Sequence, residues 1–177
     1  MESIVKAVIT YRRAIVIDVV FVLAIVFLPS LSHLFAFPLY RLEPMRLLLI
    51  LALPFAARGH SYLLALILPL VSLITSGHPL PAKALLMTAE LLLNVWLFWW
   101  LAGWLGHRFG AMLGSIAGSK LCYYGAKFLL IQVAVLNPPL VGTALWIQGV
   151  LALIFSLYIF IVFSRSENRL SEPAVES

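Results

Sequence analysis

Residues 82–105 read AKALLMTAELLLNVWLFWWLAGWL, a run of 24 residues in which only Lys83 and Glu90 are charged. A helix of this length spans about 36 Å, which exceeds the roughly 30 Å hydrocarbon core of a bilayer. A carboxylate at such depth costs several kcal/mol unless it meets a partner, water or a ligand. The segment therefore predicts a transmembrane helix, and Glu90 is the first candidate for a functional residue.

The composition of the whole chain indicates the same class of protein. Of its 177 residues 63% are apolar and 11% are charged, whereas a soluble domain carries about 25% charged residues. We therefore predict an all-α integral membrane protein of the cell (inner, cytoplasmic) membrane. The single cysteine excludes an intrachain disulfide and a CxxC zinc pattern. No nucleic-acid partner is expected, because the net charge of +5 comes from cations clustered at the span ends. No metal or cofactor is expected either.

Four segments are long and apolar enough to span a bilayer, namely residues 14–37, 82–105, 111–136 and 140–163. Residues 47–75 hold two shorter apolar runs separated by an Arg-Gly-His sequence. They could form two short tilted spans, a re-entrant hairpin or one bent span.

Cations decide the predicted topology. Lysine or arginine residues lie near both termini, and the positive-inside rule places both termini in the cytoplasm, which requires an even number of spans. Counting residues 47–75 as two spans gives a six-transmembrane-helix bundle. We expect one domain over residues 1–163 and a polar cytoplasmic tail over residues 164–177.

Polar residues of the fourth and fifth spans fall on distinct helix faces. Lys83, Glu90 and Asn94, spaced by seven and four, share one face of their helix. Counted from the outer ends at ~1.5 Å per residue, Glu90 and Lys127 both lie roughly 13 Å deep, and Gln148 lies at a similar level. We expect these three to converge in one layer, as a structural ion pair, a ligand pocket open to the outside, or a proton or ion relay. Lys120 lies deeper and should snorkel to the cytoplasm or pair internally.

Small residues mark a different face of the fifth span. Gly110, Gly114 and Gly118 recur every four residues, which predicts a groove that another helix can approach closely. The partner helix could belong to this chain, which we favour, or to another subunit.

The predicted outer loops carry cations. Arg46, His78 and Lys83 would give the rim of a pocket an anion-friendly character. The chain contains no GxSxG, HExxH or Walker A motif, so no enzymatic activity is expected.

The sequences LPLVS (68–72) and SGHPLPAKALL (76–86), followed by Glu90-Leu91 and Asn94, resemble the middle of a substrate-binding S component. S components are the membrane receptors of energy-coupling-factor (ECF) type vitamin transporters. Residues 110–130 resemble their glycine-rich fifth helix more loosely. The resemblance implies a six-helix bundle with a pocket near the outer face. It also implies docking on a transmembrane coupling subunit and two ATPase subunits.

On this hypothesis the chain binds a vitamin-like ligand that carries a carboxylate or phosphate. The predicted substrate-binding residues are Arg46, His78, Lys83, Glu90, Asn94, Tyr124, Lys127, Trp146 and Gln148. Many S components dock through an Ala-x-x-x-Ala pattern on the first helix, but here Ala14 is followed four residues later by Asp18. Docking could instead use the glycine groove of the fifth span.

Two other functions stay open at this point. A structural scaffold of the rod-shape membrane protein type would need packing grooves and no ligand. An ion- or proton-coupled small-molecule carrier would use Glu90 as its titrating group.

Overall fold

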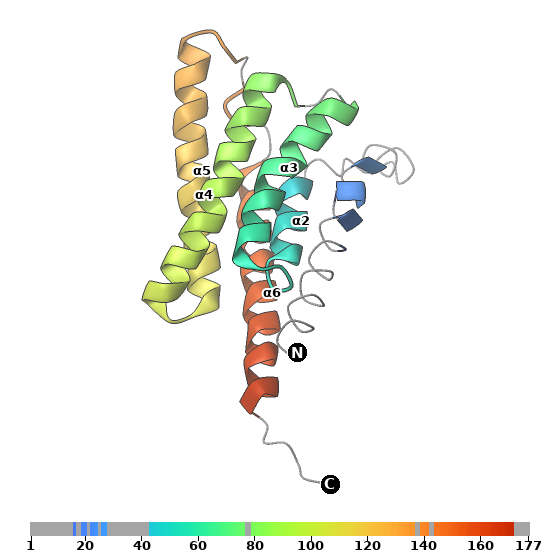
Figure 1. Ribbon diagram of the computed structural model, residues 1–177. Coiled ribbons are helices and arrows are strands. Elements are labelled where there is room, and N and C mark those ends of the chain that lie inside the picture. Colours follow the sequence, from blue (N-terminus) through green and yellow to red (C-terminus); the bar gives the residue numbers. More distant parts are fainter. Residues whose placement is uncertain are drawn as a thin grey trace.

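The computed structural model describes residues 16, 19–20, 22–24, 26–27, 43–76, 79–136, 139–141 and 144–171. The protein is all-α: from residue 43 onward the described chain forms five helices and no strand (Figure 1). These helices are α2 (Pro44–Ala52), α3 (Arg58–Ser76), α4 (Pro81–Leu105), α5 (Arg108–Gln132) and α6 (Leu145–Ser171).

Three of these helices are long and apolar enough to cross a membrane: Arg58–Thr75 in α3, all of α4, and Leu145–Ser164 in α6. Helix α5 has 25 residues, as many as α4, but its glycines, serines and three cations make it less apolar. At 25 residues α5 is about 37 Å long, so its length alone would still allow it to cross.

The prediction for residues 47–75 needs a correction. The segment does form two helices, but α2 has only nine residues and is about 14 Å long, less than half of a bilayer core. Helix α2 therefore does not make a full span by itself. It ends in a turn at Leu53, and α3 then runs back in the opposite direction (Figure 1).

The short helix α2 nevertheless lies at the centre of the bundle. Leu49 faces one buried cluster with α3 and α4, whereas Ile50 faces a second cluster with α4, α5 and α6, and both side chains are fully buried. The largest buried side chain, Phe98 of α4, belongs to the second cluster. An apolar residue on each side of α2 thus ties the helix between α3 and the rest of the bundle.

Helices α4 and α5 form an antiparallel hairpin and pack more extensively than any other pair described (Figure 1). Gly106 ends α4 with φ +70°, a conformation that glycine adopts without a steric penalty. Further along the hairpin, Gly114 faces Leu101 and Gly118 faces Leu97. A Cβ atom at these glycines would lie 3.1 and 3.0 Å from the leucine methyl groups. At these two positions the groove is therefore filled by α4 of the same chain, whereas Gly110 faces the ring of His107, the residue before α5.

Candidate functional site

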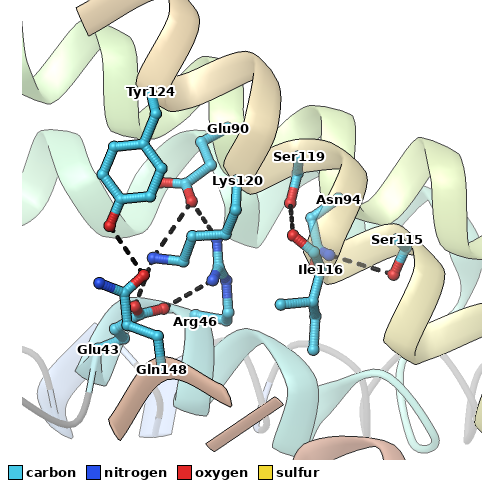
Figure 2. A network of polar contacts seen from close by, with 10 residues as sticks. All are labelled: Glu43, Arg46, Glu90, Asn94, Ser115, Ile116, Ser119, Lys120, Tyr124 and Gln148. Carbon is cyan, nitrogen blue, oxygen red and sulfur yellow. Dashed lines mark hydrogen bonds and ion pairs between the residues drawn. The ribbon is translucent and has the colours of Figure 1, made fainter. Parts of the chain in front are cut away.

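Four charged side chains from three segments meet inside the bundle (Figure 2). Arg46 of α2 donates to Glu90 of α4 through one Nη atom and to Glu43 Oε2 through the other, at 2.7 Å. Lys120 of α5 donates to the second oxygen of Glu43 and lies 3.6 Å from Glu90 Oε1. We call these four residues, Glu43, Arg46, Glu90 and Lys120, the charge ring, because each carboxylate contacts both cations.

Burial divides the charge ring into two halves. The side chains of Arg46 and Glu90 are 3% and 8% exposed, whereas those of Glu43 and Lys120 are 17% and 18% exposed. The ring is electrically neutral, with two negative and two positive groups. It therefore has a sealed pair, Arg46 with Glu90, and a more open pair, Glu43 with Lys120.

An unusual backbone conformation positions Glu43. This residue precedes Pro44, the first residue of α2, and has φ 50° and ψ 59°, in the left-handed region that few residues other than glycine adopt. Such a conformation costs of order 1–3 kcal/mol and persists only where the surroundings impose it. Here Glu43 contacts both cations of the ring, and it reaches Arg46 across one helical turn.

Aromatic and amide groups lie beside the open pair. The rings of Tyr123 and Tyr124 lie 6.0 and 5.9 Å from Lys120 Nζ, within the range of a cation–π interaction. The Tyr124 hydroxyl donates to Gln148 Oε1 of α6 at 2.8 Å (Figure 2). Helix α6 thus reaches the surroundings of the charge ring through a side chain that can both donate and accept hydrogen bonds.

A layer of uncharged polar residues adjoins the charge ring on α4 and α5. Asn94 is fully buried and donates from Nδ2 to Ser115 Oγ at 3.2 Å, while Ser119 donates to the carbonyl of Ile116 (Figure 2). Within the described part of the chain, Asn94 Oδ1 and Arg46 Nε are buried without a hydrogen-bond partner. Buried polar atoms are normally paired, so the polar layer and the charge ring each have unused hydrogen-bonding capacity.

The structure brings together only some of the predicted site residues. Arg46 and Glu90 belong to the charge ring, Tyr124 and Gln148 lie beside it, and Asn94 lies in the adjoining polar layer.

Other predicted site residues lie elsewhere. The indole of Trp146 is 71% exposed, and Lys83 is exposed near the start of α4. His78, Ala14 and Asp18 lie outside the described residues.

The predicted meeting of Glu90 with Lys127 is wrong. The Lys127 ammonium donates instead to the carbonyls of Pro139 and Leu140, at 2.8 and 2.7 Å, and Lys120 takes the place beside Glu90. The depth prediction counted from the outer ends of the two spans, but an antiparallel hairpin sets its register from the turn. Counted from the turn, Glu90 lies fifteen residues before Leu105. Lys120 and Lys127 lie twelve and nineteen residues after Arg108, so they differ from Glu90 by three and four residues and level alone does not choose between them. The carbonyls of Pro139 and Leu140 hold the ammonium of Lys127, whereas that of Lys120 reaches the Glu90 carboxylate.

Sequence reasoning left two members of the charge ring out of the predicted site. Lys120 carried a usable signal, because it is a cation within an apolar helix and internal pairing was one expected outcome. Glu43 was placed in a connecting loop, and its spacing of three residues from Arg46 was the only local sign of a pair.

Within the described residues, no three His, Cys, Asp or Glu side chains gather as metal ligands. Comparison of the chain with protein-family models, with curated proteins and with solved structures found no match. The resemblance to S components therefore stays a prediction from the sequence.

Proposed function

We propose that the protein is a multi-pass subunit of the cell membrane that binds a small, water-soluble micronutrient of the vitamin type at the charge ring, for uptake into the cell. The observation that carries this proposal is the half-open ring itself. Two of its four charges are sealed, and two remain partly accessible beside two tyrosines and a glutamine.

Stability alone gives little reason to bury such a ring. Removing each ion from water costs several kcal/mol, and well-packed apolar residues in place of a buried ion pair are often equally or more stable. The ring places four charges among helices whose neighbouring surfaces are apolar. A role of these side chains in binding explains why the protein keeps them in spite of the desolvation cost.

The division of the ring suggests how a solute binds. Arg46 and Glu90 hold each other and keep α2 against α4, while Glu43 and Lys120 exchange their mutual contact for contacts with the solute. A neutral ring with one accessible acceptor and one accessible donor suits a solute that carries both kinds of group. The faces of Tyr123 and Tyr124 suit a flat ring in that solute.

The partners in this proposal, a transmembrane coupling subunit with two ATPase subunits, rest on the sequence resemblance. The cytoplasmic placement of both termini rests on the cations near them, and α2 enters the six-helix bundle as a short helix and not as a full span.

Native mass spectrometry of the full chain, released from detergent, tests the proposal by the mass of a retained small molecule. The decisive variant is Glu43→Gln/Lys120→Met, which removes the open pair, keeps the net charge and leaves the sealed pair intact. We expect this variant to stay folded and to lose the retained molecule. The control Arg58→Gln changes a cation at the first residue of α3, outside the charge ring, and this variant should keep the bound small molecule. A protein that retains no solute from cells or from a vitamin mixture contradicts the proposal.

The scaffold hypothesis remains the second candidate, because every charge of the ring already has an opposite partner. A ring that only fixes helix register predicts a different result. Replacing all four residues by apolar ones of similar size should then leave cell shape and growth unchanged and the protein equally or more stable.

A further inference from the structure

The faces of α4 and α5 that build the charge ring each carry a second charged residue two turns further along the hairpin. Lys83 lies seven residues before Glu90, and Lys127 lies seven residues after Lys120. Seven residues are close to two full helical turns, so each lysine repeats the face of the ring residue on its own helix. Because the helices are antiparallel, both steps lead in the same direction, by roughly 10 Å at 1.5 Å per residue.

At this second level the charges are not balanced. The ring residues Glu90 and Lys120 lie 3.6 Å apart and have opposite charges, whereas the residues two turns along from each of them are both lysines, and like charges repel. The described part of the chain has three acidic residues. Glu43 and Glu90 belong to the charge ring, and Glu167 lies near the C-terminal end of α6. The described residues thus supply no carboxylate to the two lysines.

Lys127 is held in place without being neutralised. Its side chain is 8% exposed, and its ammonium donates to the carbonyls of Pro139 and Leu140. An ammonium has three donors, and the described residues accept hydrogen bonds from two of them. A buried cation that no described carboxylate neutralises costs free energy unless an anion is present.

We propose that Lys83 and Lys127 form an anion site that binds a phosphate or carboxylate group between α4 and α5. Lys127 supplies a fixed, buried donor, and the exposed Lys83 closes over the anion from the start of α4. A bridging anion turns the repulsion between the two ammonium groups into two charge-assisted hydrogen bonds. The site goes beyond the charge ring and does not depend on a solute bound there.

The group could belong to a free solute or to the phosphate of an anionic lipid, and two measurements separate these sources. The first is a ³¹P NMR titration of inorganic phosphate into the full chain in phosphatidylcholine nanodiscs. The second is native mass spectrometry of the protein released from vesicles that contain phosphatidylglycerol and phosphatidylcholine.

We expect Lys127→Met and Lys83→Met each to weaken anion binding by about tenfold or more, since one charged hydrogen bond is lost. Lys127→Arg should keep most of the binding, and Arg58→Gln should keep all of it. Lys83 is exposed, so Lys83→Met tests the site even where Lys127→Met does not fold.

Saturable phosphate binding that depends on both lysines supports the site and assigns it to free anions. Lysine-dependent retention of phosphatidylglycerol, without phosphate binding, supports the site and assigns it to lipid. Binding of neither probe, or binding by both methionine variants that is as tight as in the unsubstituted protein, overturns the proposal. The charge-ring variant Glu43→Gln/Lys120→Met should bind phosphate normally, so failure here is distinct from failure of the proposed function.

Discussion

The charge ring and the lysine pair Lys83–Lys127 occupy equivalent positions on the same two helices, yet their charges are arranged in opposite ways. In the ring, α2 contributes Arg46 and the residue before it contributes Glu43, so that every charge is matched. At the lysine pair, main-chain carbonyls bind the ammonium of Lys127, and no carboxylate of the described residues forms an ion pair with either lysine. The α4–α5 hairpin therefore sets where its charged residues lie. The segment that packs on the hairpin, α2 at the ring and the loop before α6 at Lys127, decides whether these charges are neutralised by opposite charges.

The largest expected effect comes from removing Arg46. In Arg46→Met the carboxylates of Glu43 and Glu90 lose a shared, buried partner, and only Lys120 remains between them. Breaking a buried ion network from one side costs about 3–5 kcal/mol, and we expect a loss of that size in the free energy of unfolding in detergent. The double variant Arg46→Met/Glu90→Gln should recover part of it. Equal losses in the two variants would show that the charges are not coupled.

A second prediction concerns the packing of α5 against α4, which determines the positions of both the charge ring and the lysine pair. Gly118→Leu would push a side chain into Leu97 of α4, where a Cβ atom alone already lies 3.0 Å from the nearest methyl group. We expect a loss of about 1–3 kcal/mol in unfolding free energy, as for an overpacked core. The matched control is Gly125→Leu on the same helix, where nothing lies within 4 Å of the new Cβ atom, and it should be close to neutral.

A smaller effect is expected beside the ring. Tyr124→Phe removes the 2.8 Å hydrogen bond to Gln148 and should cost about 0.5–1.5 kcal/mol in unfolding free energy. Tyr158→Phe removes a comparable bond to the carbonyl of Leu51, away from the ring, and should cost a similar amount. Only Tyr124→Phe should weaken solute retention in native mass spectrometry. Equal retention by both variants would separate Tyr124 from the binding function.

The smallest effect on stability is expected at the lysine pair. Lys127→Met leaves no carboxylate without a partner, and the carbonyl of exposed Pro139 can turn to water. The lost hydrogen bonds are offset by the desolvation cost that the ammonium no longer carries, so we expect a change within about 0.5 kcal/mol. A loss as large as that of Arg46→Met would indicate that Lys127 is a structural residue, like the members of the ring.

Some features could be predicted from the sequence because they depend on local patterns. The apolar runs around Glu90 and after Leu145 lie in α4 and α6, two of the helices long enough to cross a membrane. The spacing of Gly114 and Gly118 predicted a close helix contact, and the structure has α4 at that position. Both patterns follow from the rise and the period of a single helix, which need no knowledge of its neighbours.

The sequence by itself determined that the chain is helical and strongly apolar, and that its apolar helices contain a few charged residues that need compensating interactions. Only the tertiary structure decided which charges meet. Lys120 rather than Lys127 contacts Glu90, because carbonyls of the loop before α6 bind the ammonium of Lys127. Glu43 joins them because α2 is too short to span and lies in the middle of the bundle. Such pairings depend on relative helix level and on contacts across 77 residues of chain, which no local spacing records.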